Sequence, residues 1–225
     1  MQIQISNLTK AFADRDLFRE LNHSFVPNQV NVILGESGSG KTTLLNIIGL
    51  FESADAGQIL YDGVIVSGRS NRETRKIIRA TTGYIYQDIR LFEDLSVREN
   101  IEIALRFSHV PKSDWRSRTD VLLERMGLGG FANKPANQLS GGEKQRIAIA
   151  RTVASDKKLI LADEPTGALD EDNSKIIVNL LQDIATNNGC TVILVTHSHL
   201  VADTFKHQHW LQGGRLLDSG EHSEG

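Results

Sequence analysis

The stretch GESGSGKTT at residues 35–43 constrains this chain more than any other part of its sequence. It matches G-x-x-x-x-G-K-[ST] and lies between the apolar run VNVIL and the helical sequence LLNIIGL, the context in which such a loop binds phosphate. Its glycines let backbone N–H groups turn toward phosphate oxygens, and the following helix adds a favourable dipole. The expected nucleotide-binding residues are Gly35, Glu36, Ser37, Gly38, Ser39, Gly40, Lys41, Thr42 and Thr43.

Two apolar runs later in the chain end in side chains that suit phosphate chemistry. LILA is followed by Asp163 and Glu164, and TVILVT is followed by His197. Parallel sheets bind ligands at the carboxyl ends of their strands, so we expect these residues to meet the glycine-rich loop. In a site for a magnesium nucleoside triphosphate, Lys41 would reach the β and γ phosphates, while Thr42 and Asp163 would hold Mg²⁺. Glu164 would polarise the attacking water, and His197 would sense the γ-phosphate.

The order of the predicted elements indicates an α/β fold. Apolar runs over 3–5, 21–26 and 29–35 predict strands, and Asp62-Gly63 between two short β-type runs predicts a hairpin. Helical spacing dominates from 89 to 155, which predicts a helical insert. The runs LILAD, SKIIVNLLQDIATNNG and TVILVTH then read as strand, helix and strand, which is a parallel βαβ unit.

The stretch LSGGEKQR at residues 139–146 has two possible roles. Ser140 is a good N-cap, and Glu143 three residues later completes a capping box, so the stretch starts a helix in any case. A helix start with two glycines also presents backbone N–H groups and a dipole that favour an anion. Whether a ligand uses this helix end depends on the rest of the chain.

Taken together and in this order, the motifs resemble those of the nucleotide-binding subunits of ABC transporters, over essentially the whole chain. GESGSGKT resembles the Walker A loop, YQD with Gln87 the Q-loop, LSGGEKQR the family signature and LILADE the Walker B strand. ALD at 168–170 resembles the D-loop, His197 the switch histidine, and Phe12 the aromatic residue that stacks on adenine. Two residues depart from the family pattern: Glu143 replaces the usual Gln, and Phe12 replaces the commoner Tyr. Both replacements keep the relevant chemistry.

The resemblance implies a P-loop NTPase (RecA-like) core with an N-terminal antiparallel β lobe and an inserted α-helical subdomain, in one domain over 1–225. Residues 1–87 and 156–225 would form the β lobe and core, and 88–155 the helical subdomain. Mg-ATP would be hydrolysed in a head-to-tail homodimer in which the signature of one copy closes over the γ-phosphate held by the other. The implied catalytic residues are Glu164, His197, Lys41 and Gln87; the additional nucleotide contacts are Phe12, Ser140, Gly141, Gly142 and Asp170; the Mg²⁺ residues are Thr42, Gln87 and Asp163.

LADEPTGALD, the GYIYQD and LSVREN segments, and the chain end soon after GGRLLDSG resemble one group within this family. That group contains macrolide exporters, lipoprotein-release ATPases and exporters of bacteriocins or antimicrobial peptides. The resemblance implies an ATPase at the cytoplasmic face of the cell membrane that drives a separate integral membrane permease, with a peptide, bacteriocin, drug or lipoprotein-type substrate. Mechanotransmission of the cell-division type, without transport, is the main alternative. A soluble ATPase of DNA repair or translation is a second one, although the long coiled-coil inserts of that class are absent.

Several other features carry only ordinary expectations. The net charge of −3 gives no indication of nucleic acid, and the longest apolar runs are too short to span a bilayer. His207 and His209 lack a third ligand at a useful spacing and read as surface histidines, and residues 218–225 are expected to fray. Leu91, Phe92 and Leu95 follow the Q-loop, where contact with a membrane partner and packing within the helical lobe are equally favoured.

Overall fold

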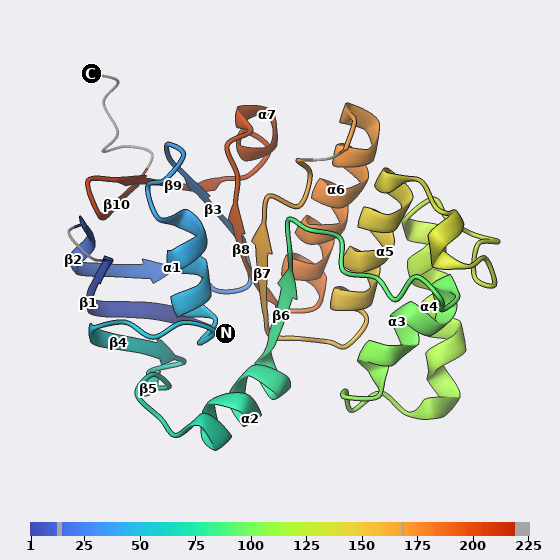
Figure 1. Cartoon of the computed structure of the whole chain (residues 1–225), viewed down its shortest axis with the longest axis horizontal. Helices are drawn as coiled ribbons and strands as arrows, with labels where there is room; N and C mark the ends of the chain where they lie inside the picture. Colours follow the sequence, from blue (N-terminus) through green and yellow to red (C-terminus); the bar gives the residue numbers. More distant parts are fainter. Residues whose placement is uncertain (13–14, 168, 219–225) are drawn as a thin grey trace.

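Two β-sheets occupy one side of the molecule and a group of helices the other (Figure 1). The computed structural model describes residues 1–12, 15–167 and 169–218. A four-stranded sheet in the order β2-β1-β4-β5 contains β1 (Ile3–Phe12), β2 (Arg15–Phe25), β4 (Ala56–Tyr61) and β5 (Val64–Ile65), all antiparallel. Asp62 and Gly63 join β4 to β5 with φ of 48° and 78°, as a type I′ turn requires. The predicted hairpin is therefore confirmed.

The second sheet carries the phosphate-binding loop. Its order is β10-β9-β3-β8-β7-β6, and its strands are parallel except β10, which runs antiparallel to β9. Every residue of β3, β7 and β8 is buried, which explains why their sequences are mostly apolar. The bounds are β3 (Val30–Leu34), β6 (Thr82–Ile85), β7 (Leu159–Asp163), β8 (Thr191–Val195), β9 (His207–Gln212) and β10 (Arg215–Asp218).

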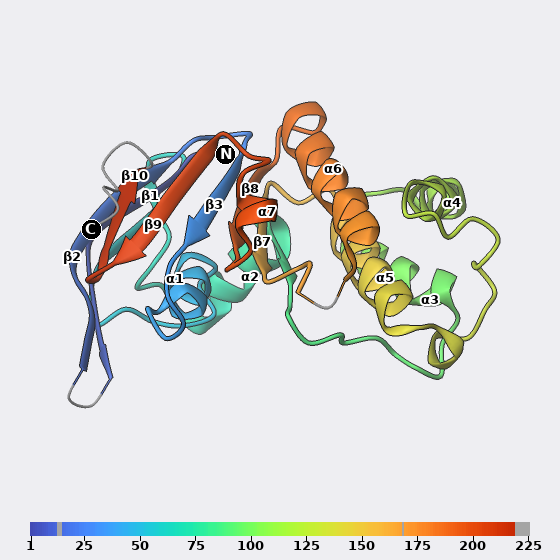
Figure 2. The same ribbon diagram turned by 90° about the horizontal axis from the view of Figure 1, so that it is seen from above.

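Helices fill two separate spaces. α1 (Lys41–Ile48) lies between the two sheets, where its leucines and isoleucines pack against apolar residues from both (Figure 2). α5 (Gly141–Val153) and α6 (Glu171–Asn187) cover the other face of the parallel sheet, with α3 (Val97–Leu105) and α4 (Trp115–Arg125) beyond them. The remaining helices are α2 (Asn71–Thr81), α7 (His199–Ala202) and the short 3₁₀ turns η1 (Lys112–Asp114) and η2 (Ala136–Gln138).

Strand ends differ from the sequence-based expectation in two places. β1 continues beyond the predicted run at 3–5, and β2 begins before the predicted run at 21–26. The prediction missed these parts because bulges and the positive φ of Asn7 and Glu20 interrupt the alternation that marks a strand. The expected fraying at Asp218 is wrong, because Asp218 pairs with His209 as the last residue of β10. Residues 219–225 lie outside the described part of the chain.

The helical subdomain over 88–155 stays a prediction. α3, α4 and α5 fall within it, and a single apolar core runs from these helices to the parallel sheet and α6. Among the described residues, no helix is both long and apolar enough to cross a bilayer.

Candidate active site

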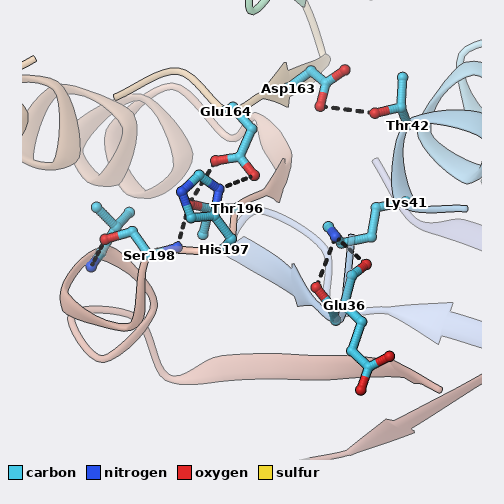
Figure 3. A network of polar contacts seen from close by, with 10 residues as sticks. Glu36, Lys41, Thr42, Asp163, Glu164, Thr196, His197 and Ser198 are labelled. Carbon is cyan, nitrogen blue, oxygen red and sulfur yellow. Dashed lines mark hydrogen bonds and ion pairs between the residues drawn. The ribbon is translucent and has the colours of Figure 1, made fainter. Parts of the chain in front are cut away.

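The loop between β3 and α1 forms a cradle with room for phosphate. Gly38 and Gly40 have φ of 77° and 100°, and nothing lies within 4 Å of the position of a Cβ on Gly38. The Ser39 hydroxyl is buried and has no hydrogen-bond partner among the described residues. Lys41 Nζ donates to the carbonyl oxygens of Gly35 at 2.8 Å and Glu36 at 2.9 Å, across the mouth of the loop (Figure 3). An orphaned hydroxyl and a lysine at an open glycine turn are what a bound phosphate would satisfy.

A hydroxyl and a carboxylate meet beside this loop. Thr42 Oγ1, in the first turn of α1, donates to Asp163 Oδ1 at the end of β7 over 3.2 Å (Figure 3). Asp163 is buried, and this burial raises the pKa of its carboxyl group, with the nearby Glu164 adding to the effect. Oxygen atoms of this kind are the ligands that Mg²⁺ prefers, so the pair fits a magnesium ion. A dication there would also offset the cost of burying the carboxylate.

The residue after Asp163 is held in one orientation by the neighbouring strand. Glu164 has φ of 47°, and its backbone N–H donates to the carbonyl of Val195 in β8. Its side chain is 11% exposed; Oε2 accepts a hydrogen bond from Thr196 Oγ1 at 3.0 Å, and Oε1 lies 2.8 Å from His197 Nδ1 (Figure 3). The His197 ring is 73% exposed. The carboxylate is therefore fixed by two partners, and the imidazole beside it faces solvent.

Sequence reasoning missed Thr196 as a functional residue. Its hydroxyl donates to Glu164 and also accepts from the backbone N–H of Ser198, so it joins the carboxylate to the start of α7. The only sequence signal was its position directly before His197 at the end of a predicted strand.

LSGGEKQR forms the start of α5, and its capping box is confirmed. Ser140 Oγ accepts from the Glu143 backbone N–H, while Glu143 Oε2 accepts from the Ser140 backbone N–H at 2.7 Å. These hydrogen bonds hold the pKa of Glu143 below its ordinary value. The acid thus turns back onto the cap, while Ser140 and Gly141 stay exposed. The cavity beside the phosphate loop, lined in part by Glu36, Ser37 and Ser39, includes no residue of this helix start.

Three comparisons identify the relatives of this chain. Residues 18–167 match the family model described as ABC transporter. The chain belongs to the ABC transporter family. A solved structure, described as a dimeric post-hydrolysis state of the ATP-binding cassette MJ0796 bound to ADP and Pi, has a TM-score of 0.86 and 32% identity, covering 99% of this chain and 100% of that one. The fold is thus the P-loop fold of an ABC cassette, as predicted, and the chain binds ATP and is an ATPase.

Its curated relatives in the ABC transporter family differ in direction of transport. The macrolide export ATP-binding/permease protein MacB of Marinobacter nauticus is 35% identical over 221 residues, which are 96% of this chain and 34% of that protein. The methionine import ATP-binding protein MetN 1 of Rhodococcus jostii is 36% identical over 226 residues, which are 97% of this chain and 66% of that protein. The chain therefore spans about a third of the first relative and about two thirds of the second.

Three further predicted site residues of this ABC ATPase lie on other elements than the phosphate loop. Gln87 follows β6 and is exposed, and Phe12 ends β1 with Lys10 Nζ 4.7 Å from its ring centroid. Asp170 caps α6 by accepting hydrogen bonds from the backbone and side chain of Asn173. Ala168, the first residue of the predicted D-loop, lies outside the described residues. The roles of Gln87, Phe12 and Asp170 stay predictions.

The structure changes two expectations for residues outside the nucleotide site. His209 is 5% exposed and packs its ring against His23, so the reading of His209 as a surface histidine is wrong. The sequence could not show this, because His23 lies in β2 of the other sheet. After the Q-loop, Leu91 packs on the core, whereas Phe92 is 52% exposed.

Proposed function

We propose that this ABC ATPase domain hydrolyses Mg-ATP at two sites shared by a head-to-tail pair of copies. The observation that carries the proposal is the position of the signature. Ser140 and Gly141 at the start of α5 are exposed, and nothing lies within 4 Å of the position of a Cβ on Gly141. The cavity beside the phosphate loop, lined in part by Glu36, Ser37 and Ser39, includes no residue of this helix start. A second copy can bring this helix start to the loop, and its N–H groups and dipole favour a γ-phosphate. The solved relative described as dimeric with ADP and Pi is consistent with this arrangement.

Each residue of the site has a definite part in the proposed reaction. The loop over 35–43 binds the phosphates, with Lys41 moving from the loop carbonyls to the β and γ phosphates. Thr42, Asp163 and Gln87 would hold Mg²⁺, which supplies charge neutralisation when bound. Phe12 would stack on the adenine ring, and Asp170 would support the D-loop at the interface.

Glu164 is the proposed general base. Its carboxylate is fixed by Thr196 and His197 at the carboxyl ends of the strands, where it can accept the proton of a water that attacks the γ-phosphate in line. His197, which lies against Glu164 and is open to solvent, would contact the γ-phosphate oxygens from the other side. Phosphate release would then let the two copies separate, and this motion would transmit the energy of hydrolysis.

We further propose that the motion drives an integral membrane permease on a separate chain, and that this complex exports a peptide, bacteriocin, drug or lipoprotein-type substrate. The domain would then lie at the cytoplasmic face of the cell membrane through that partner. The similarity to a macrolide export protein favours export, and the similarity to a methionine import protein keeps import as the alternative direction. Phe92, the exposed apolar residue after the Q-loop, is the proposed contact with the permease.

An affinity purification from native membranes tests this assignment. The Glu164→Gln variant is mixed with detergent-solubilised membranes, with ATP and Mg²⁺ or with ADP, and Phe92→Asp in the same background is the control. We expect an integral membrane protein with a large extracytoplasmic domain to be retained with ATP and lost with Phe92→Asp. That partner, reconstituted with wild-type chain in vesicles, should move substrate outward. Inward movement would mean an importer, no movement would favour mechanotransmission, and retention of only soluble nucleic-acid or ribosomal partners would contradict the membrane assignment.

A further inference from the structure

A second cluster of ligating side chains lies where the two sheets meet, outside the nucleotide site. His23 comes from β2, His209 from β9 and Asp218 from β10, and one ligand atom from each lies within 4.8 Å of the other two. These strands lie side by side in both views of the molecule (Figures 1 and 2). The cluster therefore joins the antiparallel sheet to the edge of the parallel sheet.

His209 is oriented as a metal-binding histidine would be. Its Nδ1 lies 2.7 Å from Asp218 Oδ1, and its Nε2 lies 3.4 Å from Asn31 Oδ1. Asn31 is fully buried, and its amide is fixed because Oδ1 accepts from the Val26 N–H while Nδ2 donates to the Val26 carbonyl. At 2.7 Å the Asp218 carboxylate accepts a hydrogen bond from Nδ1–H; a metal ion at Nδ1 would replace this proton, and Nε2–H would then donate to the Asn31 amide oxygen. Metal-binding histidines characteristically donate their other ring N–H to such an acceptor.

His23 brings a second imidazole that the fold leaves unsatisfied. Its Nε2 is buried and has no hydrogen-bond partner among the described residues. Its ring stands edge-on to that of His209, with 4.5 Å between the centroids. A neutral imidazole nitrogen without a hydrogen-bond partner is the kind of atom that binds a metal ion.

We propose that His23, His209 and Asp218 bind one divalent transition-metal ion of the zinc class, with water completing a four-coordinate site. Two imidazoles and one carboxylate are a ligand set that Zn²⁺ accepts. Ligand atoms about 2.0–2.1 Å from zinc in a tetrahedral site lie about 3.4 Å apart, so the cluster would rearrange on binding: Asp218 Oδ1 would move away from His209 Nδ1, now 2.7 Å from it, and the widest separation would shrink. Asp218 can make this movement, because its side chain is 67% exposed and it is the last residue of β10. Binding at Nδ1 of His209 would release any proton held there to solvent.

A metal at this position would fasten β10 to the rest of the fold. β10 pairs only with β9 among the described strands, and β9 in turn pairs with β3, which leads into the phosphate loop. The Leu211 carbonyl, two residues beyond His209, lies 2.7 Å from the position of a Cβ on Gly35. The bound ion would therefore order the strand edge that supports the first glycine of the loop.

Cobalt titration of tag-free, metal-stripped protein tests the proposal, since a polyhistidine tag would bind the ion itself. The protein is kept free of nucleotide and Mg²⁺, Co²⁺ is the optical probe for four-coordinate binding, and Zn²⁺ is then added in competition. Asp218→Asn and His23→Gln remove one ligand each, and His109→Gln removes an exposed histidine outside the cluster. ATP binding by each variant checks that it is folded.

We expect one equivalent of Co²⁺ with the strong visible absorption of a four-coordinate site, displaced by one equivalent of Zn²⁺. Asp218→Asn and His23→Gln should each weaken binding about 100-fold or more, because even an outer partner of a ligand is worth about 10–100-fold. His109→Gln should bind Co²⁺ as the wild type does. Saturating Zn²⁺ should raise the Tm of the wild type and of His109→Gln. Failure of the wild type to bind one equivalent, or binding that both ligand variants retain, would overturn the proposal.

Discussion

At the scale of single residues, Glu164 is suited to its proposed role as general base because its carboxylate has a fixed position before any ligand binds. Thr196 and His197, both at the carboxyl end of β8, hold its two oxygens at 3.0 Å and 2.8 Å. A general base that is already oriented does not have to be ordered when the water attacks. The same contacts offset the backbone strain of Glu164, whose φ of 47° is in the left-handed region although the residue is not glycine.

Glu164→Gln should lower the rate of ATP hydrolysis by about 100- to 10,000-fold, the usual range for loss of a general base. Gln is similar in shape to Glu and can still accept from Thr196, so nucleotide binding should persist. Phosphate release and ATP affinity measured on the same preparations check both statements. Turnover within a few-fold of the wild type would remove Glu164 from the mechanism.

Thr196→Val removes the hydroxyl that donates to Glu164, so kcat should fall by about 10- to 150-fold while KM for ATP changes little. The estimate follows because a hydrogen bond to a charged acceptor is worth about 1.5–3 kcal/mol. Thr196→Ser keeps the hydroxyl and is the matched control, which should recover most of the rate. If Val and Ser behave alike in steady-state kinetics, the hydroxyl does not position the base.

Single residues also show where sequence reasoning stops. Lys41, Thr42, Asp163 and Glu164 could be predicted, because each lies at a fixed offset from a glycine or a strand end. The burial of His209 could not, since it depends on contact with His23 in β2, which is remote in sequence.

At the scale of elements, three helices begin with the same reciprocal cap. α2, α3 and α5 start at Ser70, Ser96 and Ser140, and each serine exchanges hydrogen bonds with the Glu three residues later. The box at Ser140 was predicted, because a capping box depends on four consecutive residues. The contact that ties α5 to the segment after the Q-loop, Lys144 Nζ to Glu93 Oε1 at 2.6 Å, was not predicted, because these residues are remote in sequence.

The cap of α5 makes its stability depend on pH. The hydrogen bonds from Ser140 lower the pKa of Glu143, so their stabilisation is present above the ordinary glutamate pKa of about 4.3 and is lost as pH falls through the lower folded value. Glu143→Gln should flatten this dependence, because a neutral amide keeps the contact. Melting curves below about pH 4.3 should then differ from those of the wild type by about 1–4 °C, converging at pH 7. Equal slopes for both proteins would show that Glu143 carries no such effect.

At the scale of the whole molecule, the two cores separate two tasks. The core around α1 fixes the phosphate loop between the sheets, and the core around α3–α6 carries the signature and the segment after the Q-loop. The family motifs predicted that both parts exist. Which apolar side chains join a core could not be predicted. Leu91 and Phe92 are adjacent and both apolar, yet Leu91 packs on the core and Phe92 is exposed.

Phe92→Asp should uncouple the ATPase from the permease proposed above. Phe92 lies outside the site for ATP and is 52% exposed, so the purified domain should keep its own ATPase rate within about twofold. Binding to permease-containing vesicles should fall by about tenfold or more, since a charge replaces an apolar contact. Leu91→Ala, which alters the core instead, should lower the Tm. Unchanged vesicle binding by Phe92→Asp would place the docking surface elsewhere.

The most direct test of a site shared between two copies is the mass of the Glu164→Gln protein in solution. Light scattering on a sizing column, with Mg-ATP and then with ADP, should give a dimer with ATP and a monomer with ADP. Adding Ser140→Arg to Glu164→Gln should leave a monomer with either nucleotide, because the bulky cation blocks the start of α5. ATP should still bind to each chain. A Glu164→Gln protein that stays monomeric with ATP, or a double variant that still dimerises, would contradict the shared site.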